Sequence, residues 1–432
     1  MKTNKRGDLK YIVRKSKLSG SADIPGSKSH TIRALFFAAL AAGESQIRQP
    51  LDSADTSAAT SVCKSLGAGI SFSGGDIKVN GLDGAIKGVR AEIDTLNSGT
   101  SMSIGIGVAA IAENSDITLT GDAQVRKRSV GELVSALNNL GSDAACVTGN
   151  NCPPVRITSP IKGGKTALRA FSSQYLTSLL MCAPFADGDT EIEVVELLEK
   201  PYVDMTLWWM NKLGLSFDRD GYANFRIHGG QRVKGFTQRI PVDFSSATFF
   251  AAGAAMTQSE IVLGGLDLDD VQGDKAVLSI LSAMGAETLQ VEGGVSIQGR
   301  GLKGAEFDLN DTPDALPALA AAACAADGTT RLVNVPQARI KETDRIAVMK
   351  SELSKMGADI QELPDGLVIR GSALKGATVD GHSDHRVVMA LALAGLVAEG
   401  ETIITTAESV AVTFPNFADL MIKCGADITI EQ

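Results

Sequence analysis

The chain has 432 residues, of which 44% are hydrophobic and 21% carry a charge, and its formal net charge is −9. A chain of this length and composition can bury a large core and is long enough for two to four domains. The acidic balance argues against a sequence-independent nucleic-acid binder, which needs a strong basic excess.

The apolar stretches are too short for a membrane-spanning helix. The longest, 315–326 and 387–398, reach about 12 residues against the roughly 20 that a span needs. The basic N-terminus contains no apolar run of signal-peptide length, so we expect a cytoplasmic protein with neither membrane nor nucleic acid as a partner. The six cysteines lack the spacing of a zinc site or a disulfide framework. We therefore expect no metal.

One pattern recurs along the whole chain. A helix-like stretch ends in a bulky residue, then glycine, then usually a small residue, and this occurs at Gly67, Gly141, Gly214, Gly285, Gly357 and Gly425. Glycine at this position adopts the left-handed conformation that ends a helix, and a strand-like run follows, as at 69–72. The spacing of about 70 residues predicts six α/β units, which suggests two lobes of three. Coincidental helix caps are the alternative.

Apolar patterns within these units predict core-facing helices at 104–111 and 249–256, and alternation predicts a strand at 117–119.

The segment 25–35 predicts an anion-binding helix start. Pro25-Gly26 ends an extended stretch, and Ser27 or Ser29 can cap the following helix, whose free N–H groups and dipole attract anions. Lys28 adds a positive charge, and Arg33 shares a helix face with Ser29. The spacing does not fit a nucleotide P-loop. The alternative is a basic, capped helix without a ligand.

Three further segments of the first half contain anion-binding residue types. A glycine-containing helix start at 97–101 can present backbone N–H groups, 126–128 is basic, and 172–174 offers three neutral hydrogen-bonding side chains. A solvated surface and ordinary helix capping explain the last two equally well.

The second half contains two charged segments and one isolated aspartate. The run 341–345 can be a helix start with mutual ion pairs. Cations at 385–386 follow Asp384 at a helix N-terminus, where they oppose the dipole, and this suggests an anion between them. Asp314 starts an Ala-rich helix, where it can act as a cap.

Taken in order, these segments resemble the signatures of the EPSP synthase family across the whole chain. They are Pro25-Gly26-Ser27-Lys28-Ser29, Asn97-Ser98-Gly99-Thr100, Ser172-Ser173-Gln174, Lys200-Pro201-Tyr202, Gln272-Gly273-Asp274, Pro313-Asp314, Lys341-Glu342-Thr343-Asp344-Arg345 and Asp384-His385-Arg386. The resemblance implies a two-lobed α/β fold of six βαβαββ units, three per lobe, with ligands bound as the lobes close. It places residues 1–26 and 243–432 in one lobe and 27–242 in the other.

The resemblance also implies the substrates and the residues that bind them. The family joins the enolpyruvyl group of phosphoenolpyruvate to the 5-hydroxyl of shikimate 3-phosphate, in the route to chorismate and aromatic amino acids. The residues expected to bind shikimate 3-phosphate are Lys28, Ser29, Arg33, Ser172, Ser173, Gln174, Tyr202, Asp314, Gln337 and Lys341. Those expected to bind phosphoenolpyruvate are Lys28, Gly99, Arg128, Gln174, Arg345 and Arg386.

The family reaction passes through a tetrahedral intermediate and uses no metal or organic cofactor. It requires one proton to leave the hydroxyl and another to reach the methylene carbon, which suits carboxylates and a lysine. We expect Asp314 to be the general base, Glu342 the proton donor and acceptor at the methylene carbon, and Lys28 to assist both steps. Nothing in the sequence requires more than a monomer.

Four positions depart from the family pattern. Ser103 replaces an arginine, Glu199 a phosphate-contacting serine, Val412 a lysine and Gln337 an asparagine. A carboxylate beside a phosphate is repulsive unless it turns away or is paired. The alternatives are therefore an enolpyruvyl transferase with another acceptor and a binding-only homologue.

Overall fold

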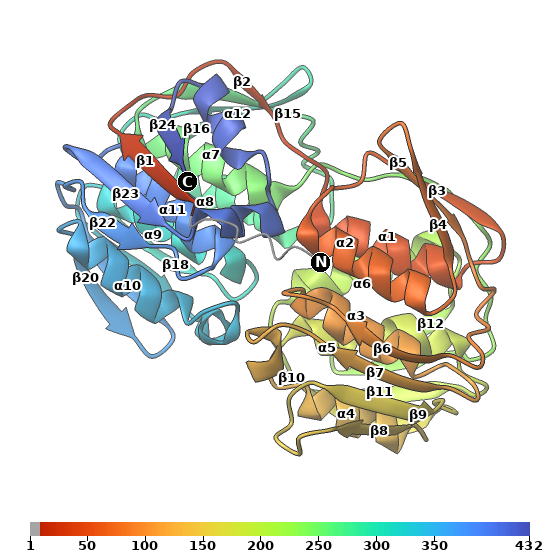
Figure 1. Cartoon of the computed structure of the whole chain (residues 1–432). Helices are drawn as coiled ribbons and strands as arrows, with labels where there is room; N and C mark the ends of the chain where they lie inside the picture. The colour runs from red at the N-terminus through yellow and green to blue at the C-terminus, as the bar shows by residue number, and fades with distance from the viewer. Residues whose placement is uncertain (1–8) are drawn as a thin grey trace. The chain divides into compact units, whose positions relative to one another are not determined.

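The structure is a computed structural model that describes residues 9–432 (Figure 1). These residues form two compact units. The N-terminal unit is Gly26–Ile240, and the C-terminal unit combines the segment up to Pro25 with Pro241–Gln432. The chain thus passes from the C-terminal unit to the N-terminal unit after Pro25 and returns after Ile240.

The N-terminal unit repeats one βαβαββ pattern three times. The first repeat consists of β14 (Thr237–Arg239), α1 (Lys28–Leu40), β3 (Glu44–Arg48), α2 (Ala54–Ser65), β4 (Gly69–Ser73) and β5 (Asp76–Asn80). The second consists of β6 (Arg90–Asp94), α3 (Gly99–Ala109), β7 (Asp116–Thr120), α4 (Gly131–Asn139), β8 (Asp143–Cys146) and β9 (Val155–Ser159). The third consists of β10 (Gly164–Ala170), α5 (Ser173–Cys182), β11 (Thr190–Leu197), α6 (Lys200–Lys212), β12 (Phe217–Asp220) and β13 (Asn224–Ile227).

The C-terminal unit repeats the same pattern. Its first repeat consists of β2 (Ser21–Asp23), α7 (Phe244–Met256), β15 (Glu260–Gly264), α8 (Ala276–Ala283), β16 (Glu287–Val291) and β17 (Gly294–Gln298). The second consists of β18 (Glu306–Asp308), α9 (Leu316–Cys324), β19 (Thr329–Val333), α10 (Arg345–Lys355), β20 (Asp359–Leu363) and β21 (Gly366–Arg370). The third consists of β22 (Thr378–Asp380), α11 (His385–Gly395), β23 (Glu401–Thr405), α12 (Phe417–Lys423), β24 (Asp427–Glu431) and β1 (Lys10–Arg14).

All six sheets have four strands in the same order: first, second, fourth and third strand of the repeat. The first pair is parallel and the other two are antiparallel, as in β6–β7, β7–β9 and β9–β8. At the two chain crossings the starting strands come from distant sequence, because β2 pairs with β15 and β14 pairs with β3. The predicted fold class of six α/β repeats is confirmed.

The first helix of each repeat is buried. Every residue of α7, α9 and α11 is buried, and so are residues 30–40 of α1 and residues 101–109 of α3. Helix α3 packs against α1 and α5, and α9 packs against α7 and α11. A helix that is apolar on all sides must be enclosed, so these helices form the core of each unit. None of the helices in residues 9–432 is long and apolar enough to cross a membrane.

The six repeated glycines end the second helix of each repeat, as predicted. All have positive φ, from 74° at Gly214 to 112° at Gly67. The residue after each glycine donates its N–H to the carbonyl five positions earlier, for example Ala68 to Cys63 and Ala426 to Met421. This is the hydrogen bond of a Schellman cap.

Gly214, at the end of α6, provides a test of these caps. A Cβ added there would meet no atom within 4 Å, so Gly214→Ala introduces backbone strain without a clash. We expect it to lower the free energy of unfolding by about 1–2 kcal/mol, the cost of a left-handed alanine. Gly214→Asn is the matched control, since asparagine tolerates this conformation and should lose less. Urea unfolding followed by the fluorescence of the two tryptophans, both in α6, measures the effect. Equal losses in the two variants would contradict the explanation.

Candidate functional site

The predicted residues of the N-terminal unit gather at the starts of its three buried helices. Lys28 and Ser29 begin α1, Gly99 begins α3, and Ser173 and Gln174 begin α5. Serines cap all three: Ser27 accepts from the His30 N–H, Ser98 from the Ser101 N–H and Ser172 from the Gln174 N–H. Helix starts carry free N–H groups and positive potential, so this cluster suits anions.

Lys28 has a partner that the sequence did not reveal. Its Nζ lies 3.1 Å from Oδ2 of Asp55, near the start of α2, and both side chains are largely buried. The carbonyl of Asp55 also accepts a hydrogen bond from the Ser101 hydroxyl at 3.3 Å. Asp55 therefore links the starts of α1, α2 and α3 and holds the lysine ammonium in place.

Gln174 connects the starts of α5 and α3. Its Nε2 donates to Thr100 Oγ1 at 3.2 Å, and its Oε1 accepts from Ser103 Oγ at 3.2 Å. Ser103, where the family has an arginine, thus helps to orient the Gln174 amide.

Gly99 and Arg128 are in close contact. A Cβ on Gly99 would lie 2.5 Å from Arg128 Nη1, so a larger residue here would displace this guanidinium. The Arg128 loop is fixed by two hydrogen bonds: Tyr175 Oη donates to the Ser129 carbonyl at 2.5 Å, and the Val130 N–H donates to the Asn151 carbonyl at 2.7 Å. Of the basic residues 126–128, the first two are exposed and Arg128 is half-buried. The solvated-surface alternative therefore holds for Arg126 and Lys127 only.

Arg33 is buried, and four of its N–H groups have partners. Nε donates to Thr206 Oγ1 at 2.9 Å, Nη1 to the Ser29 carbonyl at 3.0 Å, and Nη2 to Thr177 Oγ1 at 3.3 Å and the Tyr202 carbonyl at 2.8 Å. Burial lowers the pKa of Arg33 to about 10, against the opposing influence of Tyr202. The guanidinium thus links α1, α5 and α6 from within the unit.

The side chain of Glu199 lies at the start of α5, although its backbone lies just before α6. The residue has a left-handed conformation, with φ of 60°, and its side chain is buried. Oε2 accepts from the Ser173 hydroxyl at 2.8 Å and from the Ser173 N–H at 3.3 Å. A carboxylate of the chain itself therefore takes hydrogen-bond donors at a helix start, where an anionic ligand would otherwise bind.

The C-terminal unit builds its cluster around Arg345, which is 1% exposed. Its Nε and Nη2 donate to the two oxygens of Asp384, at 2.9 and 3.2 Å. Two further hydrogen bonds reach other carboxylates, from Nη1 to Asp314 at 2.8 Å and from Nη2 to Glu342 at 2.5 Å. Burial alone would lower the pKa of Arg345, but Asp384, Glu342 and Asp314 raise it above its usual value. Burial likewise opposes ionisation of Asp384, but Arg345 holds the pKa of that carboxyl below its usual value. The guanidinium is thus permanently charged and fixed.

Asp314 lies between two arginines. One oxygen pairs with Arg345 and the other with Arg386 Nη2 at 3.0 Å. No side chain caps the helical segments that begin at 313 and 316, so the capping alternative for Asp314 is wrong. In contrast, Asp384 does cap α11, accepting from the Arg386 N–H at 2.9 Å.

The buried Asp274 completes this cluster. Its Oδ1 accepts from Thr312 Oγ1 at 2.7 Å. Burial and then Asp314 raise the pKa of Asp274 to about 6, although Arg386 and the Thr312 hydroxyl oppose the shift.

The remaining predicted residues of this unit lie in loops and 3₁₀ turns. Gln337 is buried in the turn Pro336–Ile340 and donates to the Asn310 carbonyl at 3.0 Å, while its Oε1 has no hydrogen-bond partner among residues 9–432. Lys341 follows that turn and is half-buried. Val412 ends the turn Ala407–Val412 and brings no charge to the cluster.

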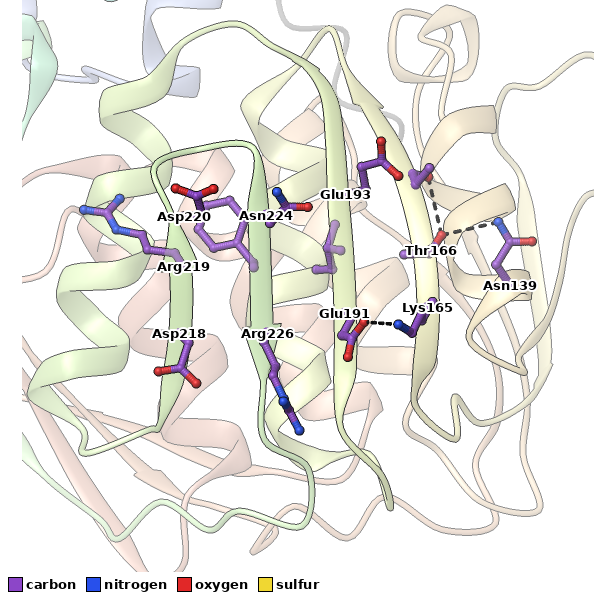
Figure 2. Close-up of a pocket in the computed structure, with 13 residues that line it drawn as sticks. Asn139, Lys165, Thr166, Glu191, Glu193, Asp218, Arg219, Asp220, Asn224 and Arg226 are labelled. Atoms are coloured by element: carbon purple, nitrogen blue, oxygen red, sulfur yellow. Dashed lines mark hydrogen bonds and ion pairs between the residues drawn. The ribbon is translucent and has the colours of Figure 1, made fainter.

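A groove elsewhere in the N-terminal unit contains none of these residues. It has a volume of about 740 Å³ and lies over β10, β11, β13 and β12 (Figure 2). Charged side chains of both signs line it, and among them Lys165 pairs with Glu191 at 2.5 Å. We therefore assign the groove to the solvated face of the sheet.

Within the described residues no group of three or more histidine, cysteine or acidic side chains could hold a metal ion. The sequence did not point to Asp55 and gave Asp384 only a capping role. Each pairs with a cation tens of residues away, so only the packing of the helices brings the partners together.

The comparisons with known proteins agree on one family. The family described as EPSP synthase (3-phosphoshikimate 1-carboxyvinyltransferase) matches residues 12–421. A 3-phosphoshikimate 1-carboxyvinyltransferase of Acetivibrio thermocellus is 53% identical over 418 residues, which cover 96% of this chain and 98% of that protein. One of Methanocella arvoryzae is 42% identical and covers 97% of this chain and 99% of its own length. The structure of an EPSP synthase of Acinetobacter baumannii superimposes with a TM-score of 0.83 at 29% identity, covering 98% of this chain and all of that one.

Asp274 generates a prediction about pH. Because its folded-state pKa is raised, the folded protein binds the Asp274 proton more tightly than the unfolded chain does. Stability should therefore fall as the pH rises from about 4 to about 6 and stay lower above that range. Asp274→Asn keeps an acceptor for Thr312 and removes the charge. At pH 7.5 the free energy of unfolding of this variant should therefore exceed that of the parent by on the order of 2 kcal/mol.

Urea midpoints of both proteins at pH 4.5 and pH 7.5, followed by circular dichroism, test this prediction. The difference between the two proteins should shrink at the lower pH. A variant that is less stable than the parent at pH 7.5 would show that ionised Asp274 stabilises the cluster.

Proposed function

Because this chain belongs to the EPSP synthase family, we propose that its two clusters of charged residues bind and convert the substrates of that family's reaction. The enzyme transfers the 1-carboxyvinyl group of phosphoenolpyruvate to the 5-hydroxyl of shikimate 3-phosphate and releases phosphate, a step of the shikimate pathway. One observation carries this assignment of residues. Arg345 pairs with Asp314 and Glu342, Arg386 pairs with Asp314, and both carboxylates can move protons.

The N-terminal cluster is assigned to substrate binding. Ser29, Arg33, Ser172, Ser173 and Tyr202 contact shikimate 3-phosphate, and Gly99 with Arg128 contacts phosphoenolpyruvate. Lys28 and Gln174 contact both substrates. The gathered helix starts support this assignment, because their N–H groups and the fixed cations suit phosphates and carboxylates.

The C-terminal cluster is assigned to the chemistry. Asp314, Gln337 and Lys341 contact shikimate 3-phosphate, and Arg345 and Arg386 contact phosphoenolpyruvate. Asp314 accepts the hydroxyl proton as the hydroxyl oxygen bonds to the enolpyruvyl carbon, and Glu342 donates a proton to the methylene carbon. Glu342 then takes a proton back from the resulting methyl group as the C–O bond to phosphate breaks, with Lys28 assisting. The proton held by Asp314 leaves with the phosphate, which restores both acids.

The ion pairs of this cluster suggest how substrate prepares the acids. Arg345 and Arg386 occupy both oxygens of Asp314, and Arg345 also bonds Glu342. Phosphoenolpyruvate brings a carboxylate and a phosphate, which guanidinium groups bind with paired hydrogen bonds. Its binding therefore gives both arginines a competing anionic partner and frees the two acids to exchange protons, while Asp384 keeps Arg345 in place.

Proton transfer and C–O bond cleavage need no electron carrier, and we propose that the enzyme works without a metal or organic cofactor. We further propose that it acts as a monomer in the cytoplasm. The family resemblance supports the first of these assignments, the reaction without a cofactor.

Phosphate release by the purified protein tests the proposed function. We expect release only when phosphoenolpyruvate and shikimate 3-phosphate are both present. Asp314→Asn keeps the shape of the side chain but cannot act as a base, and it should lower kcat by about 10²- to 10⁴-fold. Asp314→Ala should lose at least as much. Binding of phosphoenolpyruvate without phosphate release by the parent protein would instead indicate another acceptor or a binding-only role.

Glu199 provides a second prediction. Its carboxylate holds the N–H and hydroxyl of Ser173, the residue assigned to shikimate 3-phosphate. Glu199→Gln removes a negative charge beside the proposed phosphate position, so the KM for shikimate 3-phosphate should fall about tenfold, equivalent to about 1.4 kcal/mol. Glu193→Gln, on the exposed face of β11, is the control and should leave this KM unchanged. A higher KM in Glu199→Gln would mean that the carboxylate supports substrate binding.

A further inference from the structure

The turn from Asp380 to Asp384 has an unfavourable backbone conformation. His382 and Ser383 are consecutive non-glycine residues with positive φ, 52° and 55°. Gly381 before them is tightly packed, since a Cβ there would lie 2.1 Å from Val388 Cγ2. Such a conformation persists only where the surroundings hold it.

Glu352 of α10 holds this turn from one side. Its side chain is 1% exposed, although Lys355 beside it is 47% exposed. Oε2 accepts from the Asp380 N–H at 2.8 Å, Oε1 lies 3.1 Å from His382 Nε2, and Lys355 Nζ donates to both oxygens. Burial alone would raise the pKa of Glu352, but the hydrogen bonds from Lys355, the Asp380 N–H and His382 hold it below its usual value.

Asp380 and Thr406 hold the turn from the other side. Asp380 Oδ1 accepts from the His382 N–H at 2.8 Å and from the hydroxyls of Thr405 and Thr406 at 3.2 Å. Thr406 Oγ1 in turn accepts from the Ser383 N–H at 3.1 Å. Hydrogen bonds therefore fix the backbone N–H groups of His382 and Ser383, and the His382 ring has its own contact to Glu352.

The turn leads directly into the C-terminal cluster. Asp384, next to Ser383, is fully buried, bonds Arg345 through both oxygens and accepts from the Thr343 hydroxyl at 3.0 Å. It also caps α11, whose second residue is Arg386. A shift of the turn would move Asp384 and, with it, both arginines.

We propose that Glu352 and His382 form a clamp that positions Asp384, and through it Arg345 and Arg386, for phosphoenolpyruvate. This inference rests on the proposed function, which assigns that substrate to the two arginines. Glu352 and His382 are positioning residues, because the contacts described for them are to the turn and to Lys355.

Two variants and a matched control test the clamp. Glu352→Gln removes the charge from the hydrogen bonds to the turn. His382→Asn removes the ring and keeps a residue that tolerates positive φ. Lys350→Met is the control: it removes an exposed charge of α10 and leaves Glu352, Lys355 and the turn intact. We expect each of the first two variants to raise the KM for phosphoenolpyruvate about tenfold and to change that for shikimate 3-phosphate less than twofold, with no change in the control.

Hydrogen exchange gives a readout that does not depend on activity. Amides 380–386 should exchange faster in Glu352→Gln and His382→Asn than in the parent, and at the parental rate in Lys350→Met. His382 has a partly exposed side chain, so its variant keeps the test available if Glu352→Gln fails to fold.

The clamp is overturned if folded variants show parental exchange in this segment, or if the KM values of both substrates rise equally. Phosphate release by the parent is measured first and tests the proposed function separately. If the parent releases no phosphate, the hydrogen-exchange comparison alone tests whether Glu352 and His382 hold the turn in place.

Discussion

The burial of one helix per repeat is the constraint on which the rest of this structure depends. Helices such as α7, α9 and α11 are apolar on all sides, so the sheets and outer helices of the unit must enclose them completely. Their first N–H groups cannot all be satisfied within the helix, and polar partners must therefore be supplied at each start. The repeat brings these starts together, as the Gln174–Thr100 and Asp314–Arg386 contacts show. An anion-binding cluster is thus a consequence of how each core is built.

The two units meet this requirement with different residues, and the difference suits different chemistry. The N-terminal unit caps its buried helices with the neutral serines Ser27, Ser98 and Ser172, which leave the positive potential available to a bound anion. The C-terminal unit places carboxylates beside arginines, and these pairs can exchange partners and protons. This difference supports the proposed division of roles, with anion binding in the first cluster and proton transfer in the second. Glu199 is the exception, a carboxylate placed among the donors of the binding cluster.

The sequence predicted the repeat and most helix starts, because those signals are local. A glycine that must adopt positive φ, such as Gly67, leaves its mark within a few residues, and so does a capping serine such as Ser98. The partners of the charged groups were not predictable in this way. Arg345 bonds Asp384, 39 residues further on, and Glu352 reaches His382 across 30 residues. The sequence also allowed Asp314 to be a helix cap, whereas the structure pairs it with arginines. An aspartate at a helix start looks the same in the sequence in both cases.

The C-terminal cluster contains four carboxylates beside two arginines, and this excess of acids is informative. Three carboxylates share the single guanidinium of Arg345, and a fourth, Asp274, is buried close enough to Asp314 for its pKa to rise to about 6. Buried charges cost stability unless they are fully paired, so a cluster built for stability alone would contain fewer acids. Asp384 has a structural explanation, since it caps α11 and fixes Arg345. The acid–base roles proposed for Asp314 and Glu342 account for the other two carboxylates that share Arg345.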